Sequence, residues 1–392
     1  MATWQTARRD NAQKAVAASE FDALIGFSAA TVCYVTGYAS VAGQLSDHHK
    51  MAVVLCPGSS RLVLPASDRA AAVDMGINPD EMVSFGRFYF ESAQSASGRS
   101  SVDEAPVHAG VVPAIVEALR DLELDSGRIA VESGGSAIPW AELQAGVPDG
   151  IELVCASSWA QAIRRIKTPE EIELLRQSAQ ITERGIDAAI AVARPGMTEK
   201  QLSSVIARTM IDAGATPRFL VVTSGPRSAL ADAWATDRPL SRGDLLRFDV
   251  GCVYQGYWSD LGRTAVVGQA DSKQRDRYAA LLAGEQDQLD ASRPGATAGQ
   301  IFDVAMNRVR KDGLAHYRRH HCGHGIGMEV YEAPIISSGE ETVLEEGMTF
   351  CFETPYYEIG WGGMMVEDTV AITEDGIQML SSSDRSLREI PV

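Results

Sequence analysis

The first part of the chain alternates short apolar stretches with segments of helical spacing. Residues 21–27 (FDALIGF) and 51–55 (MAVVL) are nearly continuous apolar runs, which predicts buried strands. Apolar residues recur at helical intervals over residues 111–124, and a further strand begins at residues 129–131. A stretch rich in serine, glycine and acids at residues 92–106 predicts a loop. This alternation predicts a small α/β domain, and none of these segments indicates a particular chemistry.

A helix start near residue 165 marks a domain boundary. The sequence TPEE at residues 168–171 supplies a capping box, in which the threonine caps the helix and the second glutamate reaches back to the cap amide. The helix ends before the Pro-Gly pair at residues 195–196. Its apolar residues lie near one face: Ile172, Leu175, Ala179 and Ile186. We therefore expect domains of residues 1–160 and 161–392, which suits a chain of 392 residues.

The second domain contains an internal repeat. RPGMTEKQLSSV, from Arg194, and RPGATAGQIFDV, from Arg293, each combine a Pro-Gly turn, a threonine cap and an apolar helix. GDLLRFD, from Gly243, and GMTFCFE, from Gly347, share a glycine followed by an apolar strand that ends in Phe and an acid. The two matched blocks predict a duplicated helix-then-strand unit. Two such halves can pack about a pseudo-twofold axis and present their acids to one cleft.

Each half of the repeat contains two acids in an apolar hairpin pattern. Asp249 and Asp260 flank a turn whose centre falls just after Tyr254. A tight hairpin at that point would oppose the two carboxylates directly, with Cβ atoms about 4.5–5.5 Å apart. Glu353 and Glu367 flank the glycine-rich turn EIGWGG in the same way. We therefore expect one facing pair of acids in each hairpin.

Four carboxylates in one apolar cleft cannot all stay ionised without compensation. Burying an unpaired charge is costly, and like charges raise one another's pKa until some groups are protonated. A pair of divalent cations is the natural remedy, because carboxylates can bridge two metal ions about 3.5–4 Å apart. The alternative is that these acids lie on exposed strand faces.

A histidine segment completes this set of residues. In GHGIG, His324 lies between two glycines, which let the backbone approach a cleft closely. His316, His320 and His324 are spaced by four residues, but the surrounding glycines favour an extended segment over a helix. In a strand, His320 and His324 still share one face.

At these residues the chain resembles the creatinase/prolidase family of metallohydrolases (M24, the pita-bread fold). The resemblance extends over the whole chain and rests on the motifs IKTPEEI, FDVG, SDLGRT, GHGIG, ETP and VEDT. It implies an α+β fold, with a small α/β creatinase-like N-terminal domain and a duplicated pita-bread catalytic domain. It also implies five ligands for two Mn, Co or Zn ions: Asp249, Asp260, His324, Glu353 and Glu367.

The resemblance also implies roles for these residues. Asp260 and Glu367 would bridge the two ions, and the other three ligands would each bind one ion. Glu353 would also relay a proton. His320 matches the family histidine that contacts the substrate or stabilises the tetrahedral intermediate. Water activated by the metals would attack an amide carbon, and the chain contains no GxSxG motif for a serine nucleophile.

The chain departs from the prolidase pattern around the predicted pocket. Asp232, in ADAW, replaces one family histidine, and Tyr331, in YEAP, replaces another. Met365 stands where an arginine is common. These changes remove donors for a peptide's carboxylate and favour a cation or an amine, while Tyr331 can still donate one hydrogen bond. We therefore predict that five residues bind the substrate: Asp232, Trp234, His320, Tyr331 and Met365.

Three interpretations of the function follow. The first is hydrolysis of a small amide, a cyclic amidine or a compact amino-acid derivative in place of an ordinary Xaa-Pro peptide. The second is a prolidase with an altered pocket. The third is a different member of the superfamily, which could be creatinase-like, ectoine-hydrolase-like, a lyase or a non-catalytic peptide-binding scaffold. The intact set of ligands argues against metal-free chemistry and against a scaffold.

Charge and composition argue against several classes of binding partner. Asp and Glu number 52 against 35 Lys and Arg, a net charge of −17, which disfavours nucleic acid and anionic membranes. No long apolar run or secretory signal is present, so we expect a cytoplasmic protein. No GxGxxG motif or P-loop supports a nucleotide cofactor. The scattered cysteines are expected to be buried thiols: Cys33, Cys56, Cys155, Cys252, Cys322 and Cys351.

The family resemblance also implies a homodimer. In that family, loops of the N-terminal domain reach the cleft of the partner subunit. His48 and His49 are candidates for this contact, although adjacent histidines are also common on free surfaces. The remaining partner is a small-molecule or short-peptide substrate.

Overall fold

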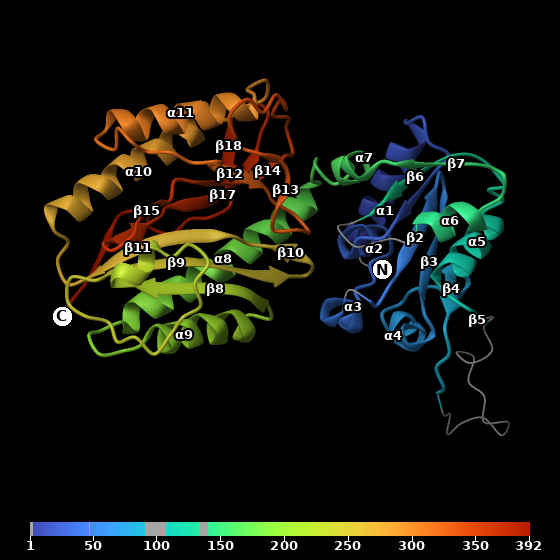
Figure 1. Ribbon diagram of the computed structural model, residues 1–392, viewed down its shortest axis with the longest axis horizontal. Helices are drawn as coiled ribbons and strands as arrows, with labels where there is room; N and C mark the ends of the chain where they lie inside the picture. Colours follow the sequence, from blue (N-terminus) through green and yellow to red (C-terminus); the bar gives the residue numbers. More distant parts are fainter. Residues whose placement is uncertain (1–2, 47, 91–106, 134–139) are drawn as a thin grey trace. The chain divides into compact units, whose positions relative to one another are not determined.

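The computed structural model describes residues 3–46, 48–90, 107–133 and 140–392. The chain forms two compact units, Met1–Arg164 and Arg165–Val392 (Figure 1). The division lies close to the boundary that the capping box predicts. The predicted loop at residues 92–106 lies outside the described residues.

In the described part of the first unit, seven strands form one sheet in the order β5-β4-β3-β2-β1-β6-β7. The pairs β1–β6, β6–β7, β3–β4 and β4–β5 are parallel, and β1–β2 and β2–β3 are antiparallel. The strands are β1 (Ala23–Gly26), β2 (Ala52–Cys56), β3 (Ser59–Pro65), β4 (Met82–Phe85), β5 (Val107–His108), β6 (Ser126–Glu132) and β7 (Gly150–Cys155). The helices are α1 (Thr3–Ala17), α2 (Ala29–Thr36), α3 (Val41–Leu45), α4 (Arg69–Asp74), α5 (Val111–Asp121), α6 (Trp140–Gly146) and α7 (Ser157–Ala162), with short 3-10 turns at Ala66–Asp68 and Pro79–Glu81. The three strands and the helix that the apolar pattern predicts here are confirmed.

The second unit contains a ten-stranded sheet among its described residues. Its main path runs β10-β9-β11-β17-β14-β12-β13, with β8 beside β9, β19 beside β11 and β18 beside β17. The strands are β8 (Thr216–Ser224), β9 (Leu245–Tyr254), β10 (Tyr257–Trp258), β11 (Leu261–Val267), β12 (Gly323–Gly325), β13 (Glu332–Ile335), β14 (Thr349–Glu353), β17 (Glu367–Ile372), β18 (Ile377–Met379) and β19 (Arg388–Ile390). A separate ribbon pairs β15 (Tyr356–Glu358) with β16 (Gly362–Met364). The helices are α8 (Pro169–Val192), α9 (Glu199–Asp212), α10 (Ser272–Ala291) and α11 (Ala298–Lys311), with a 3-10 turn at Gly225–Ala229.

The predicted duplication is visible in this unit. Helices α8 and α9 pack on the β8–β9–β11 half of the sheet, and α10 and α11 pack on the β12–β14–β17 half, each pair with its own apolar core (Figure 1). Helices α9 and α11 begin with the same capping box, Thr198 with Gln201 and Thr297 with Gln300. The two halves meet where β11 and β17 pair antiparallel, so the hairpins β9–β11 and β14–β17 lie next to each other in one sheet.

The cysteines largely match the expectation from the sequence. All six are free thiols, and four of them are buried. Cys155 corrects the prediction, because it is exposed at the end of the edge strand β7, and Cys33 is only partly buried.

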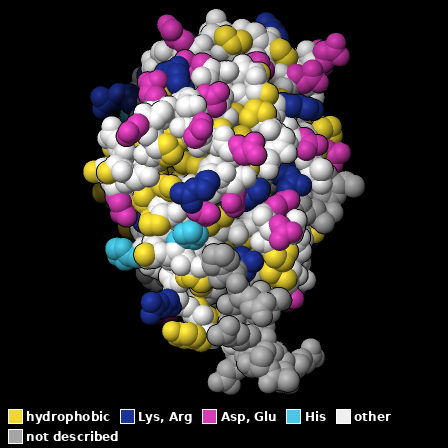
Figure 2. All heavy atoms as spheres, turned by 90° about the vertical axis from the view of Figure 1, so that its right-hand side faces the viewer, with side chains coloured by type: hydrophobic (Ala, Val, Ile, Leu, Met, Phe, Trp, Pro, Cys, Tyr) yellow, Lys and Arg dark blue, Asp and Glu magenta, His cyan; other side chains and the backbone are white. Residues whose placement is uncertain are grey.

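The surface agrees with an acidic but mixed charge distribution. On the face drawn in Figure 2, acidic and basic side chains are interspersed. No helix among the described residues is both long enough and apolar enough to cross a bilayer.

Candidate metal centre

Three of four neighbouring strands place an acid in one cross-strand row. Asp249 on β9 pairs with Gly262 on β11, Gly262 pairs with Glu367 on β17, and Glu367 pairs with Glu353 on β14. Cross-strand partners point to the same face of a sheet, so the three carboxylates share one face. The Met365 side chain fills the space over Gly262, because a Cβ atom at this position would lie 2.5 Å from Cε of Met365.

A second row, two residues along the strands, carries an aspartate and a histidine. Asp260 stands two residues before Gly262, and its carbonyl oxygen accepts hydrogen bonds from the Cys351 thiol (3.5 Å) and the Thr369 hydroxyl (3.3 Å). His324 on β12 pairs with Cys351, which pairs with Thr369. Nε2 of His324 lies 3.5 Å from Oδ2 of Asp260. The segment of His324 is therefore extended, as predicted, and the histidine meets an acid of the other half.

The register of the two hairpins confirms one prediction and corrects the other. The acids of the β14–β17 hairpin are directly opposed, as predicted. Asp249, by contrast, faces Gly262, and Asp260 lies diagonally from it. The turn is formed by Gln255 and Gly256, whose φ angles are 52° and 89°. A two-residue hairpin turn with both φ angles positive moves the centre one residue beyond the predicted point and the register by two.

Three of the predicted ligands form a buried group suited to a cation. Ligand atoms of Asp260, His324 and Glu367 all lie within 4.8 Å of one another. Oδ1 of Asp260 and Oε2 of Glu367 are buried without a hydrogen-bond partner among the described residues. Burial raises the pKa of both carboxyls, and the charge of Glu353 raises each further. Buried oxygens without partners are costly, and oxygen and imidazole donors suit Mn, Co or Zn, so the donor set fits divalent metal ions.

Asp249 lies beside this group but is paired with an arginine. Its Oδ2 accepts a hydrogen bond of 2.9 Å from Nη1 of Arg247, a fully buried residue two positions earlier on β9. Burial, together with the nearby charges of Asp260 and Glu353, raises the pKa of Asp249 to about 7, although the charge of Arg247 opposes the rise. The sequence analysis did not single out Arg247, although an arginine inside an apolar strand was a detectable signal.

Glu353 is paired with a histidine that the sequence analysis also missed. Nε2 of His321 lies 2.8 Å from Oε1 of Glu353. Burial would raise the pKa of Glu353, but the contact with His321 and the charges of Arg319 and the histidines outweigh it and hold the pKa below its usual value. The sequence favoured His320 by strand alternation, which fails here because β12 begins only at Gly323.

We call Asp249, Asp260, His324, Glu353 and Glu367 the acid–histidine cluster. The model of metallopeptidase family M24 matches residues 173–374, more than half of the chain, and the model of the creatinase/prolidase N-terminal domain matches residues 8–166. The chain belongs to metallopeptidase family M24. This result confirms the resemblance stated above and the two-domain α+β fold.

Relatives in this family are named as dipeptidases. The chain is 38% identical over 227 residues to the Xaa-Pro dipeptidase of Pyrococcus furiosus, a match that covers 57% of this chain and 65% of the relative. It is 31% identical over 282 residues to the Xaa-Pro dipeptidase of Lactobacillus delbrueckii subsp. lactis, a match that covers 71% of this chain and 77% of the relative. The match to the Pyrococcus enzyme thus spans less than two thirds of that enzyme.

Solved structures of the family share the fold over nearly the whole chain. The dipeptidase PepE from Mycobacterium ulcerans matches with a TM-score of 0.81 at 27% identity, over 99% of this chain and 98% of that chain. The prolidase from Pyrococcus furiosus matches with a TM-score of 0.75 at 27% identity, over 93% and 97% respectively.

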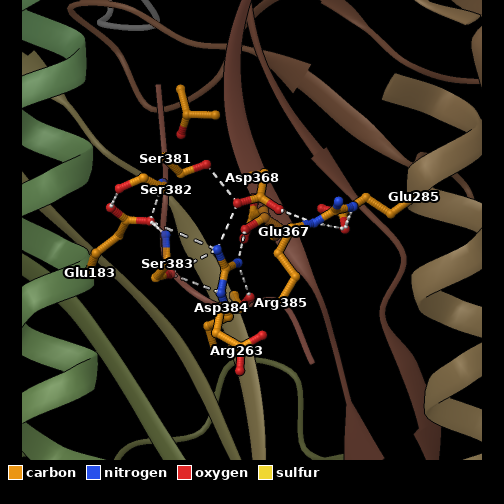
Figure 3. Close-up of polar contacts among 12 residues, drawn as sticks. Glu183, Arg263, Glu285, Glu367, Asp368, Ser381, Ser382, Ser383, Asp384 and Arg385 are labelled. Atoms are coloured by element: carbon orange, nitrogen blue, oxygen red, sulfur yellow. Dashed lines mark hydrogen bonds and ion pairs between the residues drawn. The ribbon is translucent and has the colours of Figure 1, made fainter. Parts of the chain in front are cut away.

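A buried ionic network contacts the backbone of Glu367, a member of the acid–histidine cluster (Figure 3). Nη1 of Arg263 donates to the carbonyl oxygen of Glu367 (2.6 Å), and Nη2 donates to Oδ1 of Asp368 (2.7 Å). Arg385 links Asp368 (2.8 Å) to Glu285 (2.6 Å). Buried charges that are paired in this way fix the backbone that carries the Glu367 carboxylate.

The predicted substrate-binding residues differ in their burial and in their contacts with the cluster. The Tyr331 ring stacks on the His324 ring, with centroids 3.8 Å apart, and is half exposed. Met365 is buried, and its Sδ lies 3.5 Å from Nη1 of Arg247. The His320 side chain is exposed, with its ring 4.1 Å edge-on from that of His321.

Two further predicted residues lie on the surface in this structure. Trp234 is 81% exposed and borders a hollow with Pro217 and Arg218. Asp232 is exposed in the same segment. In the first unit, Nε2 of His49 lies 2.6 Å from Oδ2 of Asp68. The histidine is thereby held in a polar group of its own unit, and His48 is exposed.

Proposed function

We propose that this chain is a hydrolase that cleaves an amide bond in a compact substrate, using two divalent cations held by the acid–histidine cluster. The observation that carries the proposal is the buried group of Asp260, His324 and Glu367, in which two oxygens have no partner among the described residues. When bound, the metals would supply water of lowered pKa and would polarise the substrate carbonyl. Mn, Co and Zn all suit these donors.

Residues of the chain itself can accept and donate the proton that the reaction transfers. Glu353 is ionised at neutral pH because His321 and Arg319 hold its pKa low. It can therefore accept a proton from the attacking water and return it to the departing nitrogen. His321, 2.8 Å away, can orient Glu353 and share that proton. Tyr331, stacked on His324, can donate a hydrogen bond to the substrate carbonyl.

The pocket positions support a substrate that differs from an ordinary Xaa-Pro peptide. Tyr331 and Met365 stand in place of a histidine and an arginine of the family pattern. Asp232, Trp234 and His320 remain proposed substrate contacts. A prolidase with an altered pocket is the second candidate, and the names of the relatives favour it.

Metal content tests the centre directly. We expect about two equivalents of transition metal per chain, measured by inductively coupled plasma mass spectrometry. Asp260→Asn should lose most of this metal, and kcat/KM should fall about a thousandfold, or about 4 kcal/mol of barrier. Asp237→Asn is the matched control, because Asp237 is exposed and pairs with Lys200 on the surface. Equal metal content in both variants would contradict the proposed ligands.

A substrate screen tests the altered pocket. The metal-loaded protein is assayed with Xaa-Pro dipeptides, lactams, amidines and small amides, with Mn, Co and Zn compared. We expect a compact amide to exceed the dipeptides in kcat/KM. Rapid turnover of Xaa-Pro dipeptides would favour the prolidase candidate instead.

We also propose a homodimer, which follows from the family resemblance, in the cytoplasm, as expected from the sequence. His48, which is exposed, remains a candidate for contact with the partner subunit. Light scattering coupled to size-exclusion chromatography measures the mass in solution, and a monomer of 42.0 kDa would contradict the proposal.

A further inference from the structure

Two guanidinium groups flank Tyr357 beside the acid–histidine cluster. Cζ of Arg247 lies 5.2 Å, and Cζ of Arg319 lies 5.4 Å, from the centre of the Tyr357 ring. Burial raises the pKa of the Tyr357 hydroxyl, and the charges of Arg247, Asp249 and Glu353 also act on it. Tyr357 and both arginines therefore lie next to the Asp249–Glu353 side of the cluster.

Arg247 uses its donors inside the protein. It is fully buried, and Nη1 donates to Asp249. The other donors meet three carbonyl oxygens at 2.6–3.0 Å: those of Ser228, Leu230 and Ala231. Arg247 therefore positions Asp249 and has no donor aimed at a ligand.

Arg319 differs from Arg247 in this respect. Its side chain is only partly buried, and its Nε is buried without a hydrogen-bond partner among the described residues. No carboxylate in the described part of the chain lies within ion-pair distance of Arg319. Burial lowers the pKa of Arg319, but the charge of Glu353 raises it, and the pKa lies above its usual value. Arg319 is thus a cation with free donors beside the cluster.

We propose that Arg319 binds the carboxylate of the substrate, next to the ring of Tyr357. This inference rests on the proposed function and names the chemistry of its substrate, an amide that carries a free carboxylate. Two divalent cations would cancel the four carboxylate charges of the cluster, so the charge of Arg319 would remain to attract an anion. A planar guanidinium suits a carboxylate, because two N–H groups can donate to its two oxygens.

Arg319 changes the charge of the substrate that is expected for this pocket. Met365 removes one guanidinium from the family pattern, which by itself favours a cationic substrate. Arg319 supplies a guanidinium from the segment before β12 instead. The substrate can therefore keep its carboxylate, while the residue that recognises it differs from that in the family pattern.

The test compares a free carboxylate with its neutral amide. Gly-Pro and Gly-prolinamide are used as probes, and their binding to the metal-loaded protein is measured by calorimetry, which needs no turnover. Steady-state kinetics on the same probes separates KM from kcat. We expect the wild-type protein to bind Gly-Pro at least about tenfold more tightly than Gly-prolinamide. Equal affinity for the two probes would overturn the inference, even in a protein that binds metal and hydrolyses amides.

Variants locate the effect. Arg319→Gln should weaken Gly-Pro binding and raise its KM about 100-fold, with kcat changed less than about threefold and Gly-prolinamide almost unaffected. Arg319→Lys keeps the charge and should restore part of the affinity. Arg318→Gln removes an exposed arginine from the neighbouring position and should behave like the wild type. An equal loss for both probes in Arg319→Gln, or no loss at all, would overturn the inference, whereas absence of metal would overturn the proposed function.

Discussion

The two hairpins of the duplicated unit have the same backbone arrangement, but their acids have different surroundings. Asp249, within β9, and Glu353, at the end of β14, occupy equivalent positions of the repeat and lie in the same cross-strand row. The residue opposite Asp249 is Gly262, whereas the residue opposite Glu353 is Glu367. The second acid of the first hairpin, Asp260, is displaced by two residues along the strand. The duplication therefore repeats the strands and not the ligand positions.

The neighbours of the two acids differ as well. Two residues before Asp249 stands the buried cation Arg247, and two residues before Glu353 stands the buried thiol Cys351. Glu353 takes its partner from another segment, because Nε2 of His321 lies 2.8 Å from its Oε1. A buried carboxylate can thus be paired with a group on its own strand or with a group from a distant segment. The two arrangements should differ in how much the partner contributes to stability and in how stability depends on pH.

The largest expected effect comes from removing the same-strand partner. Arg247→Met leaves Asp249 and three carbonyl oxygens without their donor, and we expect the free energy of unfolding to fall by about 3–5 kcal/mol. Cys351→Ala, at the corresponding place in the other hairpin, should cost about 1 kcal/mol, because it removes one small buried group. Urea unfolding of the metal-free proteins measures both values. Similar costs would show that the two hairpins do not differ in this way.

The next effect is a dependence of stability on pH in the metal-free protein. The pKa of Asp249 is raised in the folded state to about 7, so its contribution to stability is full below the unfolded value and is lost as the pH rises through 7. We expect the free energy of unfolding to fall by an amount on the order of 3 kcal/mol between pH 4 and pH 8. Urea midpoints measured at half-unit intervals check this slope.

Single variants separate the two acids. Asp249→Asn should make the decline above pH 4 shallower without removing it, because the pKa values of Asp260 and Glu367 are raised as well. Glu353 has a lowered pKa in the folded state, so its contribution is present above the unfolded value and is lost only as the pH falls. Glu353→Gln should therefore lower the free energy of unfolding by a constant amount above about pH 4.5, leave the decline towards pH 8 in place, and remove a pH dependence only below about pH 4.5. A steeper decline in Asp249→Asn than in the wild type would contradict the assignment.

The smallest expected effect concerns what the two halves share. Thr198 and Thr297 form the same capping box at the start of α9 and α11. Thr198→Ala and Thr297→Ala should each lower the free energy of unfolding by about 1 kcal/mol, since each leaves one N-terminal amide without its acceptor. Thermal unfolding of the two variants side by side checks that the costs agree. A difference greater than about twofold would show that the caps are not equivalent.

Much of the fold was accessible from local patterns. The capping box at Thr168 predicted the start of α8, because its threonine and glutamate satisfy helix amides within four residues. The facing pair of Glu353 and Glu367 was predicted correctly because its turn is symmetric about a glycine. The pair of Asp249 and Asp260 was placed wrongly, because a shift of one residue in the turn cannot be seen in the apolar pattern.

The partners of the acids could not be predicted. His321 reaches Glu353 from a segment that is not yet a strand, so the strand alternation applied to His320 and His324 gave no indication of this contact. Arg247 was not recognised because its role depends on carbonyl oxygens that follow β8 in the chain. Both contacts depend on how segments far apart in the sequence pack together.

By itself, the sequence determined the duplicated architecture, the family resemblance and the set of acids and histidine that we propose as metal ligands. These are properties of residue type and spacing, which short-range hydrogen bonding and apolar periodicity convert into helices and hairpins. Only the tertiary structure decided which acid meets which cation, and which arginine keeps free donors. Those outcomes depend on register and on contacts between strands and loops, where a displacement of a single residue changes the partner of every buried charge.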